Sequence, residues 1–458
     1  MSTIAAISTA PGIGGIGIIR MSGENSFQIL NKIFKAKKEE TIEDIKGYTI
    51  KYGKIVNPKD NQIIDEVLVS YFKAPNSYTT EDVCEINSHG GIIVVKKILE
   101  LCLENGARLA EAGEFTKRAF FNGRIDLSQV EAVIDIINAK TEKESKASIN
   151  QLEGNLSKEI NKIKENILNV LTDIEASIDY PEYDIEEVSN NKAMEMLENV
   201  QNQLEELNKS FENGKILREG IKVAIIGKPN SGKSSLLNKI LKEERAIVTD
   251  IEGTTRDTIE EFVSINGIPF KFVDTAGIRE ADNKVEEIGI EKSKKVAKES
   301  DLIIAMFDNS KNLSKEDKEI LEFIKNKKAI ILLNKCDLED KNLKEENEIK
   351  ETNKKIIKIS LLSESNLSDF YKELDIILDL NQITADNEIL ITNIRHKNLI
   401  EDAIKHTKKA KESLMVGMPI DIISINIKEI LESLAEITGE NVTEDVLKEI
   451  FSKFCLGK

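Results

Sequence analysis

The stretch VAIIGKPNSGKSSLLNKI carries the residues best suited to chemistry. A short apolar strand runs into Gly227, and the chain passes through Gly232, Lys233 and Ser234 into a predicted helix. This fits the pattern G-x-x-x-x-G-K-[ST] in the strand–loop–helix setting that the pattern requires. Backbone N–H groups of such a loop wrap phosphates, and the helix N-terminus adds partial positive charge. We therefore expect a nucleotide site in which Lys233 reaches the β and γ phosphates and Ser234 ligates Mg²⁺.

Two further motifs identify the nucleotide. KFVDTAGIRE places Asp274 at the end of a predicted strand, where a carboxylate holds Mg²⁺, and the Gly277 N–H can sense the γ-phosphate. AIILLNKCDL supplies Asn334, Lys335 and Asp337 after another apolar strand. The Asp337 carboxylate can accept both N1–H and the 2-amino group of guanine, a donor pair that adenine lacks. Together the motifs predict a GTPase.

The residues that assist hydrolysis are less clear from spacing. VTDIEGTTRD offers Thr254 or Thr255 as a switch hydroxyl on Mg²⁺, and Ser360 begins an S-L-L sequence where a base contact of the type S-A-K is expected. Many GTPases place a water-orienting Gln directly after the glycine of the D-x-x-G motif, but Ile278 stands there and cannot orient water. Spacing leaves these candidates open: Arg256, Arg279, Glu280, Glu286 and Glu287.

The surrounding pattern indicates α/β and all-α parts. Residues 1 to about 118 alternate predicted strands and helices, and the GIGGIG sequence leads into a strand, which argues against a dinucleotide-binding turn there. Apolar residues then recur at helical spacing as one continuous stripe from Ile149 to Ile178, up to Tyr180-Pro181. A parallel α/β pattern follows, and helices return after it. We expect an α/β domain inserted into a helical domain, with segments 1–118, 119–217, 218–380 and 381–458.

Composition narrows the function class. The chain has 458 residues and a net charge of −17, which disfavours broad coating of nucleic acid but permits a local basic patch. The scattered cysteines suggest reduced thiols in the cytoplasm, and no apolar run has the length of a membrane span. The terminal sequence C-L-G-K, with Cys455, lacks the features of a prenylation box.

The chain resembles the MnmE (TrmE) family of bacterial tRNA-modification GTPases over essentially its whole length. The resemblance lies in PGIGGIGIIRMSG, NSYTTEDVCEINSHGG, AGEFTKRAFFNGRIDLSQVEA, SIDYPE, LREGIKVAIIGKPNSGKSSLLN, DIEGTTRD, DTAGIRE, EEIGIE and FCLGK, in that order. It implies an N-terminal folate-binding domain that dimerises, and a helical domain interrupted by a Ras-like P-loop GTPase domain. It implies a cytoplasmic homodimer, without DNA or membrane as partner, that works with the flavoprotein MnmG (GidA), which alone carries FAD.

The same resemblance implies an activity. With MnmG, such a protein adds an aminomethyl or carboxymethylaminomethyl group at C5 of the wobble uridine (U34) of certain tRNAs. The carbon comes from 5-formyl- or 5,10-methylene-tetrahydrofolate, and GTP hydrolysis is required. Glu286 is implied as general base through bridging water, with K⁺ in place of an arginine finger. The implied ligands are Asn230, Thr249, Ile251 and Thr254 for K⁺ and Thr255 with Ser234 for Mg²⁺, and further GTP contacts fall on Ser231, Gly232, Ser235, Thr249, Thr275 and Ala276.

The resemblance also implies a folate site and a reactive centre. Arg20, Glu81, Arg124 and Lys458 fall on folate-site positions, where Arg124 replaces a Lys of some members. Cys455 becomes a candidate catalytic thiol, although a packing role is equally open. Two other classes stay open: a GTP-switched regulator similar to Ras or Era, and an RNA-binding assembly factor using the basic run Lys405, His406, Lys408, Lys409 and Lys411.

Overall fold

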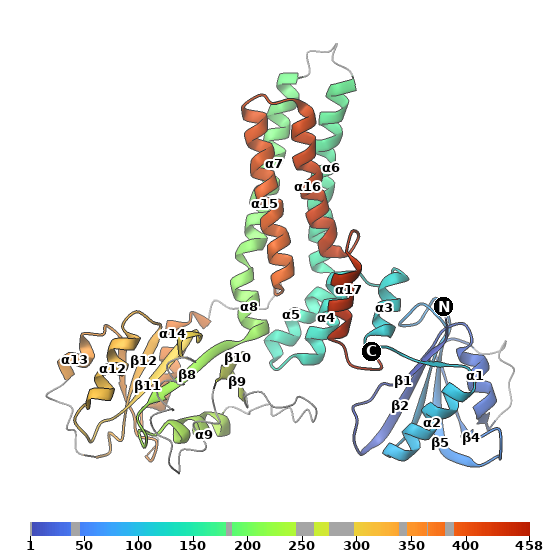
Figure 1. Ribbon diagram of the computed structural model, residues 1–458, viewed down its shortest axis with the longest axis horizontal. Helices are drawn as coiled ribbons and strands as arrows, with labels where there is room; N and C mark the ends of the chain where they lie inside the picture. The colour runs from blue at the N-terminus through green and yellow to red at the C-terminus, as the bar shows by residue number, and fades with distance from the viewer. Residues whose placement is uncertain are drawn as a thin grey trace. The chain divides into compact units, whose positions relative to one another are not determined.

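The chain folds into two compact units, each described by itself. One consists of Met1–Ile134, Gln151–Met196 and Lys409–Lys458, and the other of Asp135–Asn150 and Leu197–Lys408. In this computed structural model (Figure 1) the residues described are 2–37, 46–179, 186–243, 261–273, 297–338, 346–363, 365–380 and 389–458.

The first unit contains a seven-stranded sheet in the order β3-β4-β5-β6-β2-β1-β7. Buried and more exposed side chains alternate along its strands. In β5, for example, Val67, Val69 and Tyr71 are buried while the residues between them are not. Two helices pack on the sheet through Ile98 and Leu101 among others (Figure 1). The elements are β1 (Ile4–Ile7), β2 (Gly14–Ser22), α1 (Ser26–Ile33), β3 (Phe34–Ala36), β4 (Thr49–Val56), β5 (Ile63–Phe72), β6 (Val83–Gly90), α2 (Ile92–Glu104) and β7 (Arg108–Leu109). The GIGGIG sequence continues into β2, as expected.

Helices from both ends of the chain complete this unit. The helix α6 (Asn155–Asp179) precedes residues Leu197–Lys408 of the second unit and α16 (Ile420–Thr438) follows them, and the two helices pack against each other. Lys164 pairs with Glu440 at 2.5 Å. This confirms a helical part interrupted by an α/β part. The elements are α3 (Glu114–Phe121), α4 (Leu127–Asn138), α6 (Asn155–Asp179), α16 (Ile420–Thr438) and α17 (Glu444–Ser452).

One sequence expectation about these helices is wrong. The stripe expected to run unbroken from Ile149 to Ile178 belongs to two helices, α5 (Glu142–Leu152) and α6. Gly154 lies between them with φ of +79°, a conformation that ends a helix, and Ile149 is exposed. The sequence pattern looks continuous across Gly154 because apolar residues recur every three or four positions in both helices.

The second unit contains a six-stranded sheet in the order β13-β12-β11-β8-β10-β9. All neighbours are parallel except β9 and β10, and apolar clusters cover both faces. Strands buried on both faces read as continuous apolar runs, which explains AIILLN. The elements are α7 (Glu186–Lys209), α8 (Phe211–Glu219), β8 (Ile221–Gly227), α9 (Lys233–Glu243), β9 (Glu261–Ile265), β10 (Ile268–Phe272), β11 (Leu302–Asp308), α12 (Lys315–Ile324), β12 (Ala329–Asn334), α13 (Glu346–Lys350), β13 (Lys355–Lys358), α14 (Leu367–Ile377) and α15 (Ile394–Met415), of which α7 and α15 extend into the first unit.

Candidate functional site

The phosphate-binding loop lies where the sequence places it, between the buried strand β8 and the start of α9 at Lys233. Asn230 has φ of +63° and Gly232 has φ of +109°. A Cβ at Gly232 would collide with the side-chain amide of Asn334, so only glycine allows this approach. Ser234 and Ser235 follow in the first turn of α9, where backbone N–H groups point outward. The described chain thus has the geometry of an anion-binding helix start.

Lys233 bends back over this loop. Its Nζ donates to the carbonyl oxygens of Gly227 and Lys228, both at 2.8 Å. Burial lowers the pKa of Lys233 to about 8, because a charged ammonium loses hydration there. An anion placed beside this ammonium would stabilise its charged form.

The second motif is joined directly to the loop. Asn334, at the end of β12, donates from Nδ2 to the carbonyl oxygen of Ser231 at 2.8 Å, and both residues are buried. The backbone N–H of Leu361 donates to Asn334 Oδ1 at 3.3 Å. Two loops that are distant in sequence are thereby held against the phosphate loop.

Asp337 and Lys335 each have a partner that sequence reasoning missed. The Ser360 hydroxyl donates to Asp337 Oδ1 at 2.5 Å, so the departure from S-A-K keeps the serine that holds the acid. Lys335 donates from Nζ to Asp308 Oδ2 at 2.7 Å. Burial opposes ionisation of Asp308, but hydrogen bonds from Lys335 and Ser310 lower its pKa overall. A readable signal existed, since Asp308 ends a strand adjacent to β12.

Several predicted residues of this site lie outside the described part of the chain. They therefore stay predictions, and so do the roles assigned to them. They are Thr249, Ile251, Thr254, Thr255, Asp274, Thr275, Ala276, Gly277 and Glu286, together with Ile278 and the other water-orienting candidates.

A second candidate site is built around the end of the chain. Phe451 and Phe454 stack on each other and pack in an apolar cluster with Leu127 and Val130, which fixes the last helix. Gly457 then has φ of +90°, and a Cβ there would collide with the carbonyl oxygen of Ile7. The tail therefore lies against β1 and is held rather than frayed.

Hydrogen bonds tie the same tail to two strands of the sheet. The carbonyl oxygen of Gly457 accepts from the Ser8 hydroxyl at 3.0 Å and from Arg20 Nη1 at 3.3 Å. The carbonyl oxygen of Lys458 accepts from the backbone N–H of Phe115 at 3.3 Å. The sequence-predicted pair Arg20 and Lys458 is thus brought together, over a sequence separation of almost the whole chain.

Tyr78 links Arg20 to Arg124. The Arg20 guanidinium lies 5.8 Å from the Tyr78 ring centroid, and the Arg124 guanidinium lies 4.8 Å from it. Arg124 also donates to the carbonyl oxygen of Tyr78 at 3.2 Å, while Arg20 pairs with Glu85 at 2.8 Å. Two cations beside one aromatic ring suit a ligand that is both anionic and planar. Tyr78 lies in the family stretch NSYTTEDVCEINSHGG, but no role was assigned to it from the sequence.

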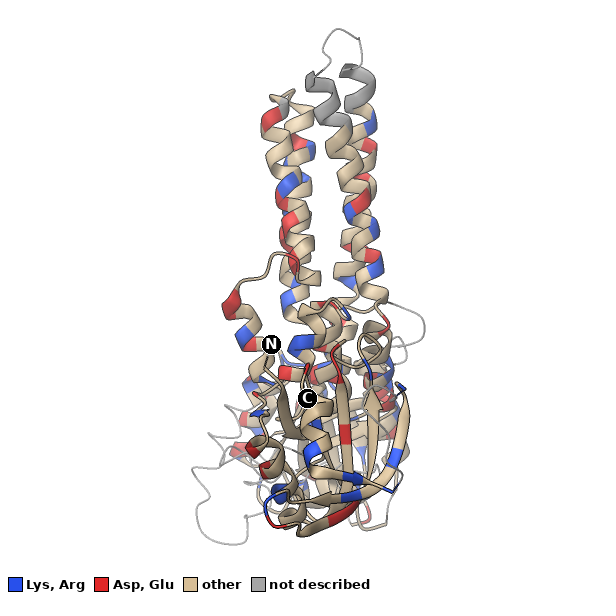
Figure 2. Cartoon of the chain, turned by 90° about the vertical axis from the view of Figure 1, so that its right-hand side faces the viewer, with Lys and Arg blue, Asp and Glu red and all other residues tan. Residues whose placement is uncertain are grey.

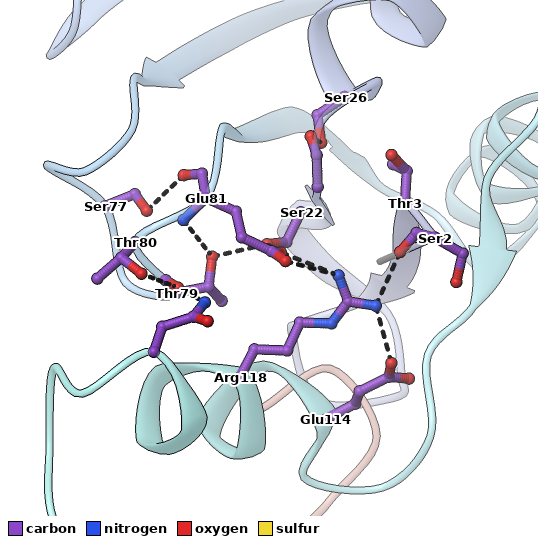
Figure 3. Close-up of polar contacts among 12 residues, drawn as sticks. Ser2, Thr3, Ser22, Ser26, Ser77, Thr79, Thr80, Glu81, Glu114 and Arg118 are labelled. Carbon is purple, nitrogen blue, oxygen red and sulfur yellow. Dashed lines mark hydrogen bonds and ion pairs between the residues drawn. The ribbon is translucent and has the colours of Figure 1, made fainter.

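Glu81 faces a polar network of its own (Figure 3). Its carboxylate accepts from the Ser22 hydroxyl at 2.6 Å and from Arg118 Nη1 at 3.1 and 2.9 Å. Arg118 is 3% exposed and also donates from Nη2 to Glu114 and to the carbonyl oxygen of Ser2. Burial opposes ionisation of Glu114, yet the hydrogen bonds it accepts from Arg108, the Glu111 backbone and Arg118 lower its pKa.

This network separates Glu81 from the other three predicted folate residues. Arg20, Arg124 and Lys458 gather around Tyr78 and the tail, whereas the Glu81 carboxylate is held by Arg118 and Ser22. At the level of sequence, Arg118 appears only within the stretch AGEFTKRAFFNGRIDLSQVEA, although it lies four residues after Glu114 on one helix. Its partner in the loop before β6 is distant in sequence and cannot be read from spacing.

Cys455 is exposed and lies just after the end of α17, beside the tail contacts. Within the residues that the structure describes, no cluster of three or more His, Cys, Asp or Glu side chains is arranged to hold a metal ion. None of the described helices is long and apolar enough to cross a membrane.

Comparison with known proteins supplies the family. A model described as the GTP-binding protein TrmE N-terminus matches residues 3–124, and a model of the MnmE helical domain matches residues 127–455. The tRNA modification GTPase MnmE of Acetivibrio thermocellus is 51% identical over 456 residues, covering 100% of this chain and 99% of the relative. That of Clostridioides difficile is 51% identical over 457 residues, with the same coverage.

Among solved structures, the G domain of the FeoB iron transporter of T. maritima aligns with a TM-score of 0.26 and 21% identity, over 35% of this chain and 99% of that one. The family assignment does not depend on it. The two family models and the full-length relatives show that this chain belongs to the MnmE family of tRNA modification GTPases.

Proposed function

We propose that this protein is a K⁺-dependent GTPase that modifies the wobble uridine of certain tRNAs together with a flavoprotein of the MnmG type. The observation that carries the proposal is the joining of the phosphate loop to the guanine motif, through the hydrogen bond from Asn334 to Ser231. The family names of its relatives supply the tRNA substrate class. The cytoplasm is the compartment that holds these substrates.

Guanine selection rests on Asp337. Its carboxylate accepts N1–H and the 2-amino group of guanine, and the Ser360 hydroxyl fixes its orientation. The Leu361 N–H donates to Asn334 Oδ1 and so holds the Ser360 loop beside the same motif. A carboxylate held in one position rejects adenine, because adenine offers no matching donor pair.

Lys233 and the loop bind the phosphates. The Lys233 ammonium exchanges its two carbonyl partners for phosphate oxygens. Burial lowers the pKa of Lys233, whereas the negative phosphates stabilise its charged form. The hydroxyl oxygen of Ser234 would ligate Mg²⁺, and the amide oxygen of Asn230 would ligate K⁺. Oxygen ligands suit such hard cations. Such cations supply positive charge beside the transferring phosphoryl group. Glu286 is proposed to orient and deprotonate water.

The residues around the tail are proposed to bind a tetrahydrofolate one-carbon carrier. Folate carries a flat pterin ring and an anionic glutamate tail, and Arg20, Tyr78 and Arg124 offer two cations around one aromatic ring. Lys458 adds a further cation. Glu81, oriented by Arg118, is of the chemical type that reads the donor edge of a pterin. A GTP-switched regulator needs no such cluster of residues, so the cluster favours the enzyme.

Calorimetry tests the folate part. Arg20→Ala should weaken binding of 5-formyl-tetrahydrofolate at least tenfold, because the variant loses a cation that also holds the tail. Lys35→Ala, an exposed lysine on β3, is the matched control and should bind as wild type does. Undiminished binding by the Arg20 variant would remove Arg20 from the site.

A further inference from the structure

A hollow lies at the amino ends of β12 and β13, which are parallel neighbours with Ile330 opposite Lys355. The loops entering these strands therefore come together at one edge of the sheet. They enclose a volume of about 470 Å³, with buried Ala329 and half-buried Ile377 at its wall. The lining residues are Lys325, Asn326, Lys327, Lys328, Ala329, Asn353, Lys354, Lys355, Glu373 and Ile377.

The lining is strongly cationic. Among its members Glu373 is the single acid, and it pairs with Lys355 at 3.5 Å, while Lys325 pairs with Glu322 outside the lining. No described acidic side chain pairs with Lys327, Lys328 or Lys354. By contrast, positive and negative side chains are interspersed along the long helices (Figure 2). A concentration of like charge costs free energy unless an anion neutralises it.

This hollow is distinct from the nucleotide site. The phosphate loop follows the carboxyl end of β8, and Asn334 stands at the carboxyl end of β12. The lysines of the hollow precede β12 and β13, at the opposite end of the same sheet. Neither GTP nor the proposed folate site in the other unit can therefore account for them.

We propose that this hollow binds the phosphate backbone of the RNA substrate, an inference that rests on the proposed tRNA function. The chain carries a net charge of −17, so RNA needs a local cationic surface to approach it. A lysine carries a point charge on a flexible side chain, unlike the planar guanidinium of arginine. Such charges suit sequence-independent contact with successive phosphates. The hollow holds the RNA in position, and its bases are recognised elsewhere.

The test uses Lys328→Glu/Lys354→Glu in the full-length protein. The control is Lys158→Glu/Lys162→Glu, two exposed lysines of α6, so that the net charge changes equally. A tRNA transcript containing U34 is titrated by fluorescence anisotropy at several salt concentrations. We expect the hollow variant to bind at least tenfold more weakly at about 0.1 M salt, with a salt slope shallower by about two. GTP hydrolysis and thermal melting should match wild type in both variants.

The outcomes separate the two proposals. If wild type neither binds nor modifies the tRNA, the proposed function fails. If wild type and both variants bind equally, the function stands and the hollow is not an RNA contact. If the hollow variant keeps tRNA binding but loses the flavoprotein partner, measured by gel filtration, the surface docks a protein and the RNA inference is wrong.

Discussion

Gly457→Ala tests whether the docked tail is needed for the proposed folate site. Gly457 has φ of +90°, where an L residue is strained, and its added Cβ would collide with the carbonyl oxygen of Ile7. The strain costs about 1 kcal/mol. The collision removes the docked conformation and with it the hydrogen bonds from Ser8 and Arg20 to the Gly457 carbonyl. Because the substitution lies beyond the last residue of α17 (Glu444–Ser452), the tail can release without unfolding that helix.

The magnitude follows from those contacts. A neutral hydrogen bond contributes about 1 kcal/mol, and one from a charged guanidinium about 1.5–3 kcal/mol. With the strain, docking of the tail loses about 3–5 kcal/mol, enough to leave it undocked in most molecules. Arg20 then loses one anchor and Lys458 loses its position, so folate affinity should fall at least tenfold.

Carboxypeptidase sensitivity and folate calorimetry measure these effects. Gly417→Ala is the matched control, since Gly417 has φ of +66° but open space around its added Cβ. That variant should lose stability by strain alone and keep both tail protection and folate affinity. A Gly457→Ala protein with wild-type resistance to carboxypeptidase and wild-type folate affinity would refute the reasoning.

Four further outcomes follow from the GTP site. GTP hydrolysis should require K⁺ and collapse in Na⁺, and equal turnover in the two salts would remove K⁺ from the account. Glu286→Ala should retain GTP binding measured with a fluorescent analogue but lose hydrolysis, whereas a near-normal rate would move the base role to another acid. Ser360→Ala removes the hydroxyl that orients the Asp337 carboxylate, so GTP should bind about 5–30-fold more weakly, the loss expected of one charge-assisted hydrogen bond. ATP binding should stay as weak as before. An unchanged ratio of GTP affinity to ATP affinity would contradict this. Because burial lowers the pKa of Lys233 to about 8 and phosphate favours its charged form, GTP affinity should fall as pH rises above about 8, with proton uptake detectable by calorimetry in buffers of different ionisation enthalpy; binding without proton uptake at that pH would contradict it.

Local motifs were readable from the sequence, and contacts between distant segments were not. The phosphate loop was predicted because strand, glycines, lysine and helix follow one another within a few residues. The break at Gly154 was missed because a glycine inside a helical pattern is common enough to be tolerated. The domain boundaries proposed from the sequence stay predictions.

At both candidate sites, the residue types could be read from the sequence but the contacts between distant residues could not. The sequence Ser360-Leu361-Leu362 was seen as a departure from the S-A-K pattern, and the contact from the Ser360 hydroxyl to Asp337 was not predicted. Arg118 was quoted only as part of a motif, because its partner Glu81 comes from a loop far away in sequence. Tyr78 belongs to the family stretch NSYTTEDVCEINSHGG but was given no role, since a single aromatic residue in a loop has many possible roles. Only the folded chain brings such residues together.

Analysis of the wobble nucleoside tests the central proposal most directly. The full-length protein is incubated with a flavoprotein partner of the MnmG type, a U34-containing tRNA, GTP, K⁺ and a tetrahydrofolate one-carbon donor, and the digested tRNA is examined by mass spectrometry. An aminomethyl-type mass addition at U34 that disappears without GTP or without the folate is the predicted result. Unmodified U34 in the complete mixture, with GTP hydrolysed at a normal rate, would contradict the proposal.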